Sequence, residues 1–170
     1  GPAAVSVLAR LAPEVAKMTF MQFNRVQLLG EDCFVSRSGY TGEDGFEISV
    51  PAAKADALAR RLLSEAEVAP IGLGARDSLR LEAGLCLYGH DMNSATTPIE
   101  ASLLWAISKV RRADGERAGG FPGAAQIFAQ QQQGVARKRV GLLPQERTPV
   151  REDAEIVDEA GNTIGRVCSG

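Results

Sequence analysis

The alternation of apolar residues between residues 18 and 50 places the strongest restriction on the fold of this chain. Apolar side chains recur through residues 18–35, and the Gly-Glu-Asp sequence at residues 30–32 interrupts them. Two such runs around a turn signal predict a β-hairpin. Residues 46–50 alternate between apolar and polar side chains, so we expect a third strand there, with the glycine-rich residues 39–45 as the loop that leads into it.

Helical spacing of apolar residues appears on both sides of these strands. Residues 4–11 show it, and residues 52–66 carry apolar side chains along one face and charges along the other. The second pattern is typical of a helix that covers a sheet. Residues 75–83 predict another helix, which ends at Gly84, and residues 68–73 are read as a strand.

A strong helix start follows at residues 97–100, which read Thr-Pro-Ile-Glu. Thr97 can cap the helix, proline suits its first position, and Glu100 can close a capping box. The pattern therefore predicts a helix that carries Leu103, Leu104 and Trp105 into a core.

The last third of the chain has a different composition. Residues 109–120 are charged and rich in glycine, which indicates a linker, and residues 122–133 predict a helix. We expect a boundary near Val135. Beyond it, three segments have the pattern of short strands: residues 139–143, 155–158 and 163–167.

Composition excludes several classes of function. The 170 residues include 19 basic and 21 acidic side chains and carry a net charge of -2, which argues against nucleic acid as the main partner. No apolar run approaches the roughly 20 residues that span a bilayer, so we expect no membrane. Cys33, Cys86 and Cys168 form no CxxC pair and His90 is the single histidine, so a metal site is poorly supported.

The loop at residues 39–47, GYTGEDGFE, is the first candidate for a binding site. Its glycines allow a tight turn beside a strand, and Glu47 offers a carboxylate. A carboxylate can accept two parallel hydrogen bonds from a heterocycle with adjacent ring N-H and amino donors. The alternative interpretation is an ordinary acidic surface turn.

A second candidate is the segment 72–84, in which Arg76 and Arg80 lie four residues apart on one helical face. Arg76 could receive a carboxylate of a ligand. The segment superficially resembles a dinucleotide fingerprint, but Asp77 replaces the third glycine and would repel a pyrophosphate. The alternative here is pairing along the helix, such as Asp77 with Arg80.

Residues 36–48, SRSGYTGEDGFEI, and 74–89, GARDSLRLEAGLCLYG, resemble the signature stretches of the aminomethyltransferase family, the T-proteins of the glycine cleavage system. TPIEA at 97–101, FPG at 121–123 and GRVCSG at 165–170 resemble that family in the same order. The likeness covers nearly the whole chain.

The resemblance implies a reaction and its participants. In the family, the lipoylated H-protein delivers an aminomethyl group whose carbon passes to tetrahydrofolate, with release of ammonia and with no metal. By motif position Glu47 resembles the carboxylate that holds the pterin, and Arg76 the arginine of the folate site. Tyr40 and Trp105 are candidates for the pocket wall. Such a protein is cytoplasmic in a bacterium and lies in the mitochondrial matrix of a eukaryote.

The family fold implies an α+β architecture, an antiparallel sheet with covering helices, followed by the start of a β-barrel. We expect residues 1–110 to form part of the folate-binding region, residues 111–134 a linker and helix, and residues 135–170 an incomplete barrel. The family's catalytic aspartate has no counterpart in these residues, so we expect a fragment that is inactive alone.

Two related families are the alternatives. A folate-dependent demethylase module shares the loop plan, but Asp44 and Phe46 favour the T-protein. A non-catalytic folate-binding protein of the iron-sulfur assembly kind would carry a cysteine signature that the chain lacks.

Overall fold

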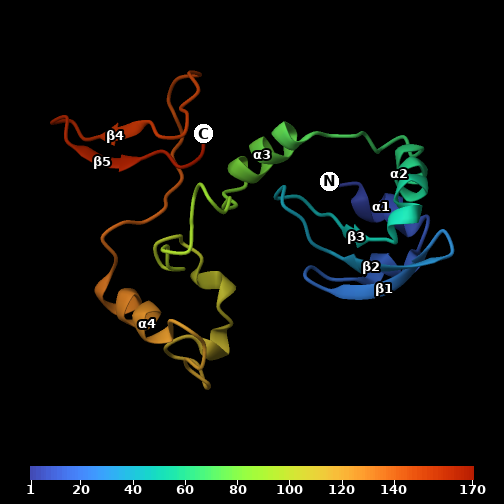
Figure 1. Cartoon of the computed structure of the whole chain (residues 1–170), viewed down its shortest axis with the longest axis horizontal. Coiled ribbons are helices and arrows are strands. Elements are labelled where there is room, and N and C mark those ends of the chain that lie inside the picture. Colours follow the sequence, from blue (N-terminus) through green and yellow to red (C-terminus); the bar gives the residue numbers. More distant parts are fainter. The chain divides into compact units, whose positions relative to one another are not determined.

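The computed structural model describes residues 1–170, which divide into two compact units, residues 1–85 and residues 86–170 (Figure 1). The first unit contains a three-stranded antiparallel sheet with helices, and the second contains short helices and a two-stranded antiparallel sheet. This architecture confirms the α+β class. None of the helices combines the length and the apolar composition that a membrane span requires.

The sheet of the first unit has the order β1-β2-β3, formed by β1 (Phe23–Leu28), β2 (Glu31–Ser36) and β3 (Glu47–Ser49). The hairpin is confirmed, but its turn lies at Leu29 and Gly30, which have φ angles of 53° and 78°. Two positive φ angles give a two-residue turn whose twist matches that of the strands. Asp32 therefore lies within β2, opposite Gln27, rather than in the turn.

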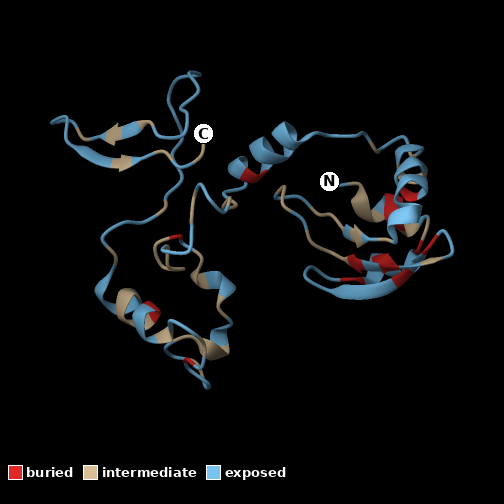
Figure 2. Ribbon diagram, viewed as in Figure 1, coloured by how far each residue is buried: buried red, intermediate tan, exposed pale blue.

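One face of this sheet is buried by α1 (Ala4–Ala9), the 3-10 helix η1 (Pro13–Lys17) and α2 (Ala55–Leu63), which follows the short η2 (Ala52–Lys54). Alternate residues of β1 and β2 point into this core, because side chains alternate between the faces of a strand. Figure 2 shows the buried residues gathered between the strands and these helices. The core consists of Leu8, Ala12, Val15, Met18, Val26, Leu28, Cys33, Val35 and Leu58.

The chain between α2 and α3 (Leu73–Glu82) contains no strand, so the predicted strand at residues 68–73 is wrong. Pro70 has no N-H to give to a sheet, and Ile71 is 63% exposed. Leu73 instead begins α3, which contains most of the predicted helix at residues 75–83 and ends two residues before Gly84.

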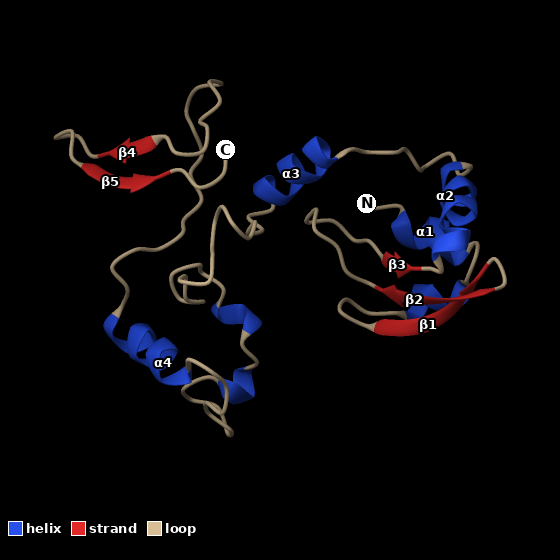
Figure 3. Ribbon diagram, viewed as in Figure 1, coloured by secondary structure: helices blue, strands red, loops and turns tan.

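The second unit contains α4 (Ala124–Gln133) and a hairpin of β4 (Glu155–Val157) and β5 (Thr163–Arg166) (Figure 3). These elements confirm the helix expected at residues 122–133 and the last two strands. Residues 139–143 form no strand, because Arg139 directs its backbone N-H and its side chain to the carbonyls of Glu100 and Ala101 instead. The unit contains no closed barrel.

The predicted capping box forms, but its helix does not. The Glu100 N-H donates to Thr97 Oγ1 at 3.2 Å, and the Thr97 N-H donates to Glu100 Oε2 at 2.8 Å. Ser102 then takes a φ of 59°, which ends the helical turn, and only the 3-10 helices η3 (Leu104–Ala106) and η4 (Lys109–Arg111) follow. Trp105 is 70% exposed, so the prediction that it enters a core is wrong.

Candidate functional site

The glycine-rich loop is closed at its base by an arginine fork. Arg37 Nε donates to Asp44 Oδ1 and Nη2 donates to Asp44 Oδ2, both at 2.9 Å. Arg37 Nη1 also donates to the carbonyl of Met18, and the guanidinium lies 5.8 Å from the centre of the Phe46 ring. The pair lowers the pKa of the Asp44 carboxyl below its ordinary value, chiefly through these side-chain hydrogen bonds. Arg37 thus joins the two ends of the loop.

Gly42, at the middle of the loop, touches the end of α3. Its φ is 78°, and a Cβ atom at this position would lie 2.6 Å from the Cβ of Ala83. Only glycine allows both this backbone conformation and this close approach. The contact sets the loop against the helix that carries Arg76.

Arg76 lies in the first part of α3 and reaches the loop through an aromatic contact. Its guanidinium carbon lies 4.8 Å from the centre of the Tyr40 ring, within the range of a cation-π interaction. The Arg76 side chain is exposed, so its charge remains accessible to an anionic group.

Arg80, one turn further along α3, has a structural position. It is 3% exposed, and its Nε donates to Asp77 Oδ1 at 2.7 Å. Pairing along the helix, which the sequence left open for these two residues, is therefore present.

Glu47 is the first residue of β3 and lies opposite Ser36 of β2. Its side chain is exposed, and its Oε2 accepts a hydrogen bond of 2.6 Å from Ser38 Oγ. The carboxylate is thus held by a neutral hydroxyl and has no ion pair with a basic side chain.

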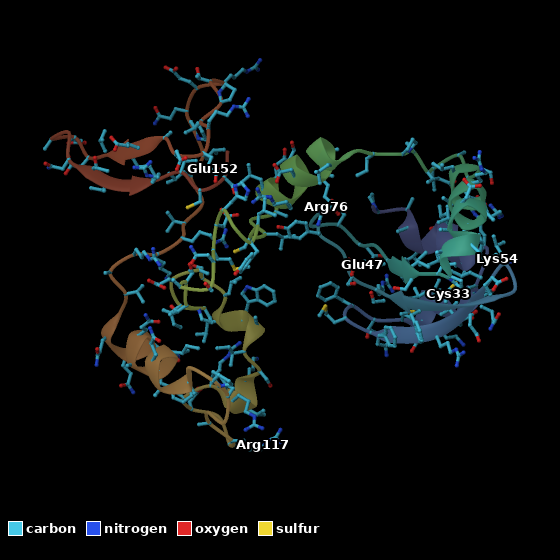
Figure 4. All side chains as sticks on the ribbon, viewed as in Figure 1. Cys33, Glu47, Lys54, Arg76, Arg117 and Glu152 are labelled. Atoms are coloured by element: carbon cyan, nitrogen blue, oxygen red, sulfur yellow. The ribbon has the colours of Figure 1, made fainter.

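Three of the side chains proposed for the site meet at one cavity of about 550 Å³. Tyr40, Glu47 and Arg76 all line it, together with Ser38, Glu43 and Phe46. Figure 4 shows Glu47 on the strand side and Arg76 on the helix side of this part of the unit. A volume of this size suits a small organic ligand, and an acceptor and a cation on one cavity provide two different points of recognition.

Trp105, the fourth residue proposed for the site, belongs to the second unit, where it lies on η3. It is not among the residues that line the cavity of the first unit. Its assignment to the pocket wall stays a prediction.

Sequence reasoning missed Ser38 and the fork formed by Arg37 and Asp44. Opposite charges seven residues apart on either side of a glycine loop were the available signal for the fork. Ser36 and Ser38 share the two-residue spacing that places side chains on one side of a strand, but their relation to Glu47 depends on the register of β2 with β3.

Comparison with known proteins identifies the family. The family model of the GCVT N-terminal domain matches residues 1–111. The mitochondrial aminomethyltransferases of Pisum sativum and Gallus gallus are each 51% identical to the chain over its whole length. The matched region is 41% of the pea protein and 43% of the chicken protein, so the chain spans about two-fifths of the length of these curated relatives.

A solved structure agrees with the sequence comparison. The glycine cleavage system aminomethyltransferase T from Bartonella henselae superposes with a TM-score of 0.81 at 46% identity, covering 98% of this chain and 44% of that one. The eukaryotic relatives are named as mitochondrial, so a cytoplasmic location is not confirmed. The order of motifs, the fold and these matches together show that the chain belongs to the glycine-cleavage aminomethyltransferase family, the GCVT family.

Proposed function

We propose that this segment forms part of the folate site of an aminomethyltransferase of the glycine cleavage system. The reaction transfers the methylene carbon of an aminomethyl group, carried by the lipoyl arm of the H-protein, to tetrahydrofolate and releases ammonia. Tetrahydrofolate is a substrate in this reaction, and the lipoylated H-protein is the protein partner. The relatives matched over the whole chain support this proposal.

The observation that carries the proposal is the position of Glu47 and Arg76 on the same cavity. A pterin in its neutral lactam form presents a ring N-H and an amino group side by side, which suits the Glu47 carboxylate. Arg76 offers a permanent positive charge for an anionic group of the substrate, and the Tyr40 ring holds its guanidinium in place. The residues present therefore fit a folate.

We assign no catalytic residue within this segment. Asp44 is engaged in the fork with Arg37, and Asp77 accepts from Arg80. A general base must reach the proton that it removes, and neither aspartate lines the cavity. Both carboxylates support the structure around the site instead.

The domain plan and the location complete the proposal. Residues 1–110 are assigned to the folate-binding region, residues 111–134 to a linker and helix, and residues 135–170 to the start of a barrel. The protein would act in the mitochondrial matrix in a eukaryote and in the cytoplasm in a bacterium. The plant and animal relatives are named as mitochondrial, which supports the first of these.

The test compares Glu47→Gln with Glu43→Gln in a full-length aminomethyltransferase containing this segment. An amide presents one acceptor and one donor, so it would set an N-H against an N-H of the pterin. We expect Glu47→Gln to weaken tetrahydrofolate binding by roughly 1.5–3 kcal/mol, about one to two decades in dissociation constant.

Glu43 lines the same cavity from within the loop and is the matched control, with a much smaller expected effect. Calorimetric titration measures both variants, and circular dichroism checks that they fold. Unchanged affinity of Glu47→Gln would remove the proposed site.

A further inference from the structure

Ser36 lies on the same side of the sheet as Glu47, and Ser38 reaches the Glu47 carboxylate from just beyond the end of β2. Ser36 is the Cα partner of Glu47 across the antiparallel pair β2 and β3. Residues directly opposite each other on such strands present their side chains on one face. Ser38 follows two residues later, and its side chain reaches the same carboxylate.

The chemistry of these groups fixes the direction of their hydrogen bonds. An ionised carboxylate only accepts, so Ser38 donates its one hydroxyl proton to Glu47 Oε2, at 2.6 Å. That distance is typical of a hydroxyl bonded to a charged oxygen. The contact of 2.8 Å between the two serine oxygens then needs its proton from Ser36. The result is a chain of donors that runs from Ser36 through Ser38 to Glu47.

We propose that Ser38, supported by Ser36, is a positioning residue that orients the Glu47 carboxylate for the paired donors of a pterin-type ring. This inference rests on the proposed function of Glu47. The last torsion of a glutamate side chain is broad, so an exposed carboxylate has no fixed plane of its own. One hydrogen bond from a half-buried serine selects an orientation before the ligand arrives.

Ser38 leaves the carboxylate able to bind. A carboxylate has about four lone-pair sites on its two oxygens, and Ser38 occupies one of them. The other sites are sufficient for a ring N-H and an amino N-H. The hydroxyl therefore organises the acceptor without competing with the ligand.

The expected effect of Ser38→Ala is a loss of preorganisation. Immobilising one flexible side chain corresponds to about a two- to tenfold change in affinity, so the dissociation constant and the KM for tetrahydrofolate should rise by that factor. The kcat should stay within about twofold, because the pterin contact is the same in the ground state and the transition state. Ser38→Thr keeps the hydroxyl and should retain the wild-type KM.

The experiment measures tetrahydrofolate binding and steady-state kinetics in a full-length aminomethyltransferase containing this segment. The variants are Ser38→Ala, Ser38→Thr, Glu47→Gln and the double variant with Ser38→Ala and Glu47→Gln. In the Glu47→Gln background, Ser38→Ala should add less than it does alone, because the carboxylate that it orients is gone.

The outcomes separate the two claims. If Glu47→Gln weakens binding and Ser38→Ala does not, the positioning role is wrong and the proposed function stands. If Glu47→Gln has no effect, the proposed folate site at Glu47 is wrong, and the role of Ser38 is wrong with it. A fall in kcat for Ser38→Ala at constant KM, or a Ser38→Thr variant as defective as Ser38→Ala, would overturn the positioning role in favour of a general structural one.

A ligand-free measurement on the 170-residue chain completes the test. The carboxyl ¹³C resonance of Glu47 responds to a hydroxyl donor, so Ser38→Ala should shift it and Ser38→Thr should not. Ser36→Ala should give a smaller shift, because it acts through Ser38. An unmoved resonance in Ser38→Ala would refute the donor chain whatever the full-length variants do.

Discussion

Replacement of Gly42 by alanine tests whether the loop and the helix α3 meet as closely as the structure indicates. Two separate penalties are expected. A residue with a side chain at a φ of 78° is strained by about 1–2 kcal/mol, of which about 0.4–1 kcal/mol is offset by the lower entropy of the unfolded chain. The added methyl group would also lie 2.6 Å from the Cβ of Ala83, and overpacking of this kind costs about 1–3 kcal/mol.

Gly30 provides the matched control. It has the same φ of 78° in the hairpin turn, but a Cβ atom there would meet no atom within 4 Å. Gly30→Ala therefore measures the backbone penalty alone, about 0.5–1 kcal/mol, whereas Gly42→Ala is expected to destabilise the chain by about 1.5–4 kcal/mol. Adding Ala83→Gly to Gly42→Ala removes the clashing methyl group and should restore part of the stability that the overpacking costs. The gain is reduced by up to about 1 kcal/mol, because glycine is unfavourable at the end of a helix.

The assay is urea unfolding of the 170-residue chain, followed by circular dichroism, for the two single variants and the double variant. Equal destabilisation by Gly30→Ala and Gly42→Ala would show that the loop does not rest on Ala83 in solution. Failure of Ala83→Gly to restore any stability would lead to the same conclusion. Either result would also remove the contact that places Tyr40 beside Arg76.

Three further outcomes are expected. Arg37 lowers the pKa of Asp44, so this pair stabilises the fold fully above the unfolded carboxyl pKa of about 4 and loses that stabilisation as the pH falls through the lower folded pKa. Urea midpoints measured between about pH 6 and pH 2 should fall accordingly, and the fall should be smaller in Asp44→Asn. Hydrogen exchange should protect residues 135–170 less than residues 5–105, since a two-stranded sheet leaves unpaired edges, and equal protection would contradict this. The isolated chain should show no aminomethyl transfer with H-protein and tetrahydrofolate, and turnover above a blank without the chain would refute the absence of a catalytic residue.

The parts of the fold that sequence predicts are those set by local periodicity. The hairpin, β3, α2 and α3 all form where the pattern predicts them. The hairpin, β3 and α2 pack apolar side chains into the core of the first unit, whereas the one buried residue of α3 is Arg80. The capping box at Thr97 is equally local, and it forms. The helix expected after the capping box does not form, because Ser102 takes a positive φ that the neighbouring sequence does not predict.

Some residues of the candidate site can likewise be predicted from the sequence, and others only from the structure. Glu47 and Arg76 are identified from their motifs, because the charge and hydrogen-bonding capacity of a carboxylate or a guanidinium can be read directly from the residue type. Ser38 is found only from the register that sets Ser36 opposite Glu47, and the contact of Gly42 with Ala83 only from the position of α3. Contacts between residues distant in sequence need the three-dimensional arrangement, and spacing alone does not provide it.

Glu47 and Arg76, which both line the cavity, are held by different interactions. Glu47 is fixed by β-sheet pairing and by the Ser38 hydroxyl, whereas Arg76 is fixed by α3 and by the Tyr40 ring. The loop that carries Tyr40 depends in turn on the Arg37 fork and on Gly42. A disturbed loop therefore acts first on the position of Arg76, while the Glu47 acceptor keeps its own support. Because Glu47 and Arg76 are held by separate contacts, the proposed recognition of a ring by Glu47 and the proposed recognition of an anionic group by Arg76 should be separable by mutation.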